Sequence, residues 1–268
     1  MDHPKANAEK VFISSALDPL AVGEINEGLQ PHEEVSKMLS ILTDAGIQCC
    51  FVQEQALIYY GTTRVPRDLV LCIPDEQFQR AVELFSSNSH ILQPCGPSPL
   101  RSPNLLNHKY PRFKAIGWAS FWLLVPGNYC HLTVKPENIE WSLGGLPYPK
   151  LSVYVQSAID SKSLLDLEEL IDGMDLSEEW GHKTLDLEGQ TDTQWLEDRA
   201  QAFRDDGVDE MFIFVDPTPV SRREIWLDAV SEIWIQGPKE CPQAWFVDIL
   251  NTQLAKFDAY REPNSVAI

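Results

Sequence analysis

Basic side chains are concentrated in two short stretches of a chain that is otherwise acidic. Arg64 and Arg67 form the first stretch, and a second follows within 14 residues: Arg101, His108, Lys109, Arg112 and Lys114. Guanidinium and ammonium groups bind phosphates and carboxylates through charge-assisted hydrogen bonds. We therefore expect a site for a small phosphate-bearing ligand, with these binding residues: Arg64, Arg67, Lys109, Arg112 and Lys114. The alternative is a solvated loop whose charges balance the acidic helices.

Acidic residues gather in the second half of the chain. Residues 160–216 hold 18 Asp or Glu against four Lys or Arg. Such a density is typical of the water-facing surface of helices, so we interpret it as solvation, with a protein-interaction surface as the alternative, rather than as a metal site. The sequence contains no calcium-loop, zinc-protease, serine-hydrolase or nucleotide-loop motif.

Net charge and hydropathy narrow the classes of function. The formal net charge is −19 and the pI about 4.6, which argues against nucleic acid and anionic membranes as partners. No run approaches the roughly 20 apolar residues that cross a bilayer, and the polar start of the chain lacks the apolar core of a secretory signal. Six cysteines without a CxxC pair indicate buried, reduced thiols. Together these features predict a cytoplasmic protein that contacts no membrane.

Hydrophobic periodicity predicts an α/β core that would position the basic residues. We expect a leader segment at residues 1–32, the core at 33–155 and a helical C-terminal region at 156–268. The core elements are predicted as helices at 33–45, 55–60 and 75–85, strands at 47–52, 68–73 and 151–155, and a β-hairpin of 116–125 with 129–134. A long loop at 94–111 carries most of the second basic stretch, and loops of that length inside compact domains are often functional.

The C-terminal region is predicted to be mostly helical. The periodicity places helices at 156–171, 191–204, 221–235 and 242–260, with one short strand at 211–215. Trp226 and Trp234 lie two turns apart on the third of these helices. We interpret them as packing residues, with a partner-binding surface as the alternative.

Residues 51–74, FVQEQALIYYGTTRVPRDLVLCIP, resemble the signature of the nucleotidyltransferase-fold superfamily. In that family a strand ends in a glycine pair, a short helix carries an Ala and ends near a Gly, an Arg follows, and the next strand holds two acids. Ala56, Gly61, Arg64 and Asp68 match four of those positions. Residues 145–150 and 172–181 are also similar to a broad group of fungal proteins. The resemblance implies a mixed sheet flanked by helices and makes Asp68 the candidate catalytic and metal-binding residue.

Several positions depart from the family pattern. The second acid corresponds to Val70, the glycine pair to Gln53 and Glu54, and the predicted hairpin strands at 121–125 and 130–134 contain no acid. Nucleotidyl transfer uses two divalent cations bridged by carboxylates, and Mg²⁺ requires several oxygen ligands. The sequence therefore does not decide whether the protein binds a cofactor, because Mg²⁺ is implied by the resemblance but Asp68 is its one predicted ligand.

Three functions follow from these observations. The favoured hypothesis is a nucleotidyltransferase-fold protein with a degenerate metal site that binds a ligand or a partner protein without catalysing nucleotidyl transfer. The first alternative is an active transferase of fungal specialised metabolism that uses non-standard site residues. The second is an acidic protein-interaction module.

Overall fold

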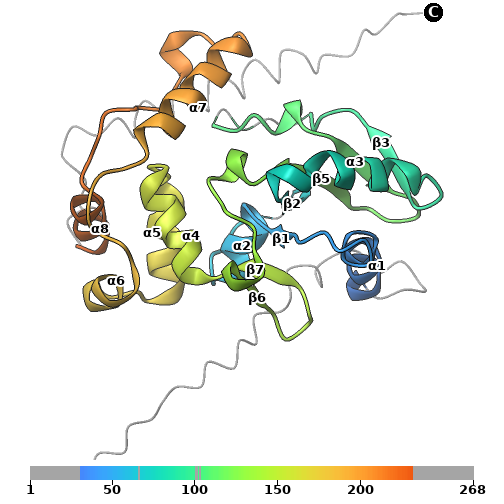
Figure 1. Cartoon of the computed structure of the whole chain (residues 1–268), viewed down its shortest axis with the longest axis horizontal. Helices are drawn as coiled ribbons and strands as arrows, with labels where there is room; N and C mark the ends of the chain where they lie inside the picture. Colours follow the sequence, from blue (N-terminus) through green and yellow to red (C-terminus); the bar gives the residue numbers. More distant parts are fainter. Residues whose placement is uncertain (1–30, 66, 100–101, 103, 232–268) are drawn as a thin grey trace, which may run out of the picture. The chain divides into compact units, whose positions relative to one another are not determined.

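The computed structural model describes residues 31–65, 67–99, 102 and 104–231 (Figure 1). The predicted features that lie outside these residues are most of the leader segment at 1–32, the basic residue Arg101, Trp234 with the end of the predicted helix at 221–235, Cys241, and the predicted helix at 242–260. Within the described residues the protein is a mixed α/β structure, which confirms the predicted fold class. None of the described helices is long and apolar enough to span a membrane.

A mixed five-stranded sheet forms the centre of the fold. Its strands lie in the order β1-β2-β5-β4-β3. Their bounds are β1 Cys50–Phe51, β2 Leu69–Ile73, β3 Leu92–Cys95, β4 Arg112–Ala115 and β5 Phe121–Pro126. The pair β2 and β5 is parallel and the other pairs are antiparallel. All five residues of β2 are buried, as expected for a continuous apolar run covered on both faces.

The described residues of the first half of the chain form three α-helices: α1 Pro31–Thr43, α2 Glu54–Tyr59 and α3 Phe78–Ser87. The apolar residues of α1 recur at helical spacing, and Val35, Met38 and Leu42 are at most 1% exposed. Phe85 of α3 packs edge-on against Phe113 of β4 and Trp122 of β5. The amphipathic patterns that predicted these helices therefore describe the faces that they bury.

The predicted hairpin of 116–125 with 129–134 is wrong. Strand β5 instead pairs with β4 before it and in parallel with β2, and the residues after it form a 3-10 turn at Asn128–Cys130. The turn requires glycine at Gly127, because a Cβ there would lie 2.5 Å from the carbonyl oxygen of Leu132. An apolar run indicates a strand but does not specify its partner, so the pairing could not be read from the pattern.

Two other predicted strands are also absent. Residues 151–155 open helix α4, Leu151–Asp160, and residues 211–215 include a 3-10 turn, Glu210–Phe212, instead of a strand. Short apolar runs fit a buried helix as well as a strand. A two-stranded antiparallel sheet of β6, Ile139–Trp141, and β7, Pro147–Pro149, precedes α4.

The remaining helices are α5 Leu164–Met174, α6 Glu178–Thr184, α7 Thr193–Asp205 and α8 Arg222–Val230. The predicted helix at 156–171 is divided into α4 and α5 at Lys162, which has a φ of 52°. Trp226 of α8 is fully buried and packs on Trp180 of α6, so packing and not partner binding explains it. Trp234 lies outside the described residues.

The described residues up to Val230 form one compact unit. Helix α4 runs from Leu151 to Asp160, so it continues across the domain boundary that was predicted at residue 155. The residues before and after this boundary are in close contact. Gly61, after α2, lies so near to α5 that a Cβ on it would be 2.6 Å from the carbonyl oxygen of Gly173. The five described cysteines are free thiols, and Cys49, Cys50 and Cys72 are buried as predicted, whereas Cys95 and Cys130 are only partly buried. Cys241 lies outside the described residues.

Candidate functional site

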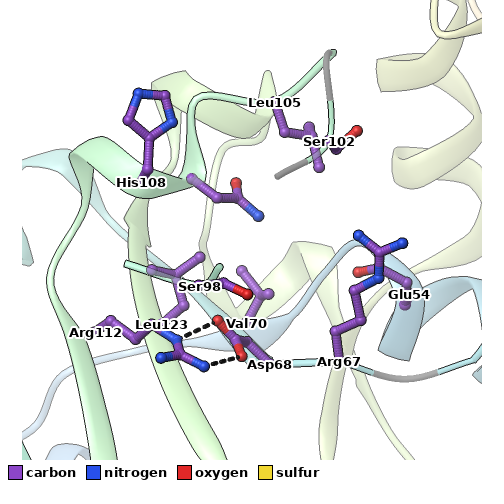
Figure 2. Close-up of a pocket in the computed structure, with 11 residues that line it drawn as sticks. Glu54, Arg67, Asp68, Val70, Ser98, Ser102, Leu105, His108, Arg112 and Leu123 are labelled. Atoms are coloured by element: carbon purple, nitrogen blue, oxygen red, sulfur yellow. Dashed lines mark hydrogen bonds and ion pairs between the residues drawn. The ribbon is translucent and has the colours of Figure 1, made fainter. Parts of the chain in front are cut away.

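An open pocket lies where strand β2 begins (Figure 2). Its empty volume is about 520 Å³, including space that is open to solvent. Side chains from α2, the start of β2, the loop after β3, and strands β4 and β5 line it: Glu54, Arg67, Asp68, Val70, Ser98, Ser102, Leu105, Asn107, His108, Arg112 and Leu123. The loop predicted at 94–111 thus borders a pocket together with Arg67 of the first basic stretch and with His108 and Arg112 of the second.

The sheet register explains why residues from three strands meet at the pocket. Val70 of β2 is the partner of Leu123 in β5, and Leu123 is also the partner of Arg112 in β4. Partner residues on neighbouring strands point to the same face of a sheet. Asp68 lies two residues before Val70, so it shares that face as well.

Asp68 and Arg112 form a two-point ion pair across this face (Figure 2). The Arg112 Nε donates to Asp68 Oδ2 at 2.6 Å and Nη2 donates to Oδ1 at 2.8 Å. Arg112 also donates through Nη1 to the Gly96 carbonyl at 3.3 Å, and its guanidinium stacks 3.8 Å from the centre of the Phe121 ring. The Asp68 hydrogen bonds raise the pKa of the Arg112 guanidinium, which therefore stays charged.

The surroundings of Asp68 do not fit a divalent cation. Both of its carboxylate oxygens accept hydrogen bonds from Arg112. Val70 and Leu123, the nearest positions on the same face, offer hydrocarbon in place of oxygen ligands. Across the described part of the chain, no group of three or more His, Cys, Asp or Glu is arranged to hold a metal ion. The metal-binding role that the resemblance implied for Asp68 thus has no support in the donor set.

Arg67 is the basic residue that remains available to a ligand. Its side chain is exposed and lines the pocket next to Glu54, on the side opposite Arg112 (Figure 2). The Arg67 guanidinium makes no ion pair or hydrogen bond with any residue that the structure describes. A carboxylate or phosphate entering the pocket would meet this guanidinium, although Glu54 beside it disfavours a highly charged anion.

Three of the five predicted ligand-binding residues do not line the pocket. Arg64 pairs at 2.7 Å with both Asp166 and Glu169 of α5. Burial lowers the pKa of Arg64, but its hydrogen bond to the Glu169 carboxylate and the charge of Asp166 outweigh that effect, and the pKa is raised. These contacts join α5 to the core, so the Arg64 guanidinium is unavailable to a ligand.

The other two misplaced residues also have partners of their own. Lys109 lies 3.9 Å from the Asp206 carboxylate, and Lys114 donates to the Trp118 carbonyl and stacks 4.4 Å from the Phe121 ring. A long basic side chain pairs with the acceptors that the fold brings near it. The position of Lys109 and Lys114 within a basic stretch of the sequence did not reveal those acceptors.

Asn107 is a site residue that the sequence patterns did not identify. Its side chain exchanges two hydrogen bonds with Gln53, at 2.9 and 3.1 Å, and accepts a third from the Tyr129 hydroxyl at 2.7 Å. Gln53 has a φ of 57°, in the region that favours glycine. The family that the sequence resembles has a glycine at this position. That glycine was the available sign of the unusual backbone conformation of Gln53, the residue to which Asn107 is hydrogen-bonded.

No protein-family model matches the chain, and no curated protein sequence matches it. The chemistry open to the pocket therefore follows from its lining residues. It offers one available guanidinium, several hydroxyl and amide groups, and a carboxylate whose oxygens are occupied by Arg112.

Proposed function

We propose that this chain is a ligand-binding protein on a nucleotidyltransferase-like core, and that it does not carry out metal-dependent nucleotidyl transfer. The ion pair between Asp68 and Arg112 is the observation that carries the proposal. The order of helix, strand, helix and strand from α1 to β2, with Asp68 immediately before β2, supports the fold assignment. In this interpretation, the guanidinium of Arg112 neutralises the carboxylate that a catalytic member of the fold would offer to a metal.

The energetics favour the guanidinium over a metal ion. The side chains of Asp68 and Arg112 are 14% and 8% exposed, so a metal that took the carboxylate would leave a nearly buried guanidinium without its negatively charged partner. Breaking a buried ion pair in this way costs roughly 3–5 kcal/mol. That cost would weaken metal binding at Asp68 by roughly 10²- to 10³-fold or more. Among the described residues that line the pocket, the other carboxylate is that of Glu54, which lies beside Arg67 on the side opposite Arg112 (Figure 2).

The ligand is proposed to be a small molecule that carries one phosphate or carboxylate group. Arg67 would bind that group, and the hydroxyl and amide groups at Ser102 and Asn107 would complete the polar contacts. Leu105 and Leu123 supply apolar surface to the same pocket. A net charge of −19 and the carboxylate of Glu54 both act against a polyphosphate or a nucleic acid.

Calorimetric titration with ATP tests the catalytic part of the proposal. ATP would be added with Mg²⁺, with Mn²⁺ and with EDTA, and pyrophosphate release would be followed in parallel. We expect no pyrophosphate and no binding that depends on the metal. Metal-dependent binding together with pyrophosphate release would contradict the proposal and favour an active transferase.

Thermal-shift measurements in EDTA test the ligand part. Inorganic phosphate and a set of phosphomonoesters would be compared on the native protein and on Arg67→Met, with Arg80→Met as a control. Arg80 is an exposed residue of α3 that does not line the pocket. We expect a phosphomonoester to stabilise the native protein and the control but not Arg67→Met. If none stabilises the native protein, or Arg67→Met responds equally, the phosphate-binding role is wrong.

A further inference from the structure

One wall of the pocket is a short segment of the loop between β3 and β4. Leu105, Asn107 and His108 of residues 104–110 all line the pocket. This segment contains one 3-10 turn, Asn107–Lys109. Its other backbone groups form their hydrogen bonds mostly with residues outside the segment. Its position therefore depends on the residues that contact it from other elements.

The C-terminal end of α7 holds this segment through one carboxylate. Asp206, which caps α7, accepts a hydrogen bond from His108 Nε2 at 2.8 Å and lies 3.9 Å from Lys109 Nζ. The side chains of His108 and Asp206 are 16% and 22% exposed, so water screens the pair only partly. The His108 ring points away from the Asp68–Arg112 pair (Figure 2). Its role is thus to attach the wall to α7.

Arg199, also on α7, holds the other end of the same segment. Its Nη2 donates to the Asn104 carbonyl at 3.2 Å, and its guanidinium stacks 4.3 Å from the centre of the Tyr129 ring. The Tyr129 hydroxyl donates to Asn107 Oδ1 at 2.7 Å and accepts from the Leu106 amide at 2.8 Å. Arg199 therefore contacts the segment directly and also supports the tyrosine that binds its centre.

Helix α7 has its own anchors, so it does not depend on the segment for its position. Leu196, Ala200 and Phe203 are at most 3% exposed. At its N-terminus Asp192 accepts from the Trp195 amide at 3.0 Å, and the Trp195 indole donates to the Asn128 carbonyl at 2.6 Å. Loss of Asp206 or of Arg199 should therefore free the segment and leave the helix in place.

We propose that Arg199 and Asp206 are positioning residues for the ligand pocket, and that α7 sets the wall formed by residues 104–110. The inference rests on the proposed function in that the pocket is taken as the ligand site. It extends the site to a helix whose contacting residues lie 95 to 98 positions further along the chain, beyond the core that was predicted to bind the ligand. It also predicts that movement of α7 changes the pocket without any change at Asp68 or Arg112.

Hydrogen exchange measured by mass spectrometry tests the proposal without any ligand. The variants are Asp206→Asn and Arg199→Met, and the reporters are peptides that cover 104–110, where Lys109 and Tyr110 have hydrogen-bonded amides. We expect exchange in this segment to become roughly tenfold faster or more, as for the loss of a charge-assisted hydrogen bond. Exchange in β2 and in α7 should keep the native rate.

Two matched variants control for the change in charge. Asp205→Asn removes the neighbouring carboxylate, which accepts a hydrogen bond from Gln201 within α7, and Arg204→Met removes a guanidinium that pairs with Glu210. Both should leave exchange at 104–110 unchanged, and Asp206→Glu, which keeps the carboxylate, should restore most of the protection. If Arg199→Met does not fold, Asp206→Asn alone decides the result.

The proposal is overturned if residues 104–110 exchange at the native rate in Asp206→Asn and Arg199→Met, or if the two controls accelerate them equally. Uniform acceleration along the whole chain would also overturn it, since it would show a loss of global stability. A native protein that binds no phosphomonoester, but whose exchange responds as expected, would contradict the proposed ligand and leave the positioning role of α7 intact. Normal phosphomonoester binding with unchanged exchange would contradict the positioning role alone.

Discussion

Replacement of Arg112 by methionine tests the ion pair on which the proposed function depends. Methionine keeps an unbranched side chain against Phe121 but removes the guanidinium, so the Asp68 carboxylate, 14% exposed, loses both hydrogen bonds. Breaking a buried ion pair from one side costs roughly 3–5 kcal/mol. The pocket is open to water at Asp68, so we expect the lower end, about 3 kcal/mol. For a domain of this size that loss lowers Tm by about 6–12 °C.

A double-mutant cycle separates the ion pair from the other contacts of Arg112. Asp68→Asn should also destabilise the protein, because it leaves a guanidinium that is 8% exposed without its carboxylate. The double variant Asp68→Asn/Arg112→Met has no buried charge without a partner, so its loss should fall below the sum of the single losses by about 2 kcal/mol. Urea unfolding followed by tryptophan fluorescence measures all four free energies of unfolding.

Additivity of the two losses within about 0.5 kcal/mol would refute the reasoning, because residues that do not interact show additive effects. A second result would refute it more directly. If Arg112→Met regained its stability in millimolar Mg²⁺ or Mn²⁺ and released pyrophosphate from ATP, then Asp68 would be one substitution away from a competent metal site.

Three further predictions concern the pocket, the loss of stability at acidic pH and the packing of α6. Val70→Asp should cost several kcal/mol, because Val70 is 1% exposed, and pyrophosphate assays with Mn²⁺ should detect no activity. The hydrogen bond from Lys162 lowers the pKa of Asp216 from 3.8 to about 2, so its contribution to stability is present above pH 4 and is lost as pH falls toward 2. Asp216→Asn should flatten that part of a plot of urea midpoint against pH. Gly181→Ala should cost roughly 1–3 kcal/mol by thermal unfolding, because its Cβ would lie 2.1 Å from the Trp226 ring.

Each of these predictions has a control within the same chain. Thr218→Ser keeps the hydroxyl that hydrogen-bonds to Asp216 and also keeps the Lys162 ion pair, so it should leave the shape of the pH plot unchanged. Gly96→Ala adds a Cβ that meets nothing within 4 Å, so it should change Tm little. A pyrophosphate signal from Val70→Asp, an unaltered loss of stability at acidic pH in Asp216→Asn, or equal effects of Gly181→Ala and Gly96→Ala would each contradict the corresponding prediction.

The sequence by itself determined the elements whose evidence is local. The spacing of Val35, Met38 and Leu42 predicted α1, and the same spacing rule placed α7 within two residues of its observed start. Strand β2 was predicted from a continuous apolar run. These predictions succeed because helix periodicity and strand hydrophobicity depend on residues within about ten positions of each other. The mixed α/β class followed from the order of such elements.

The tertiary structure decided which of the charged residues meet. Arg64 and Arg112 both belong to the predicted basic site, yet one pairs with α5 and the other with Asp68, 44 residues before it. The register of β2, β5 and β4 brings Arg112 to Asp68, and that register depends on strand pairings between distant segments. A basic side chain pairs with whichever carboxylate the fold places within reach, and sequence distance carries no information about that choice. For the same reason the contact between His108 and Asp206, 98 residues apart, emerged only when the chain was folded.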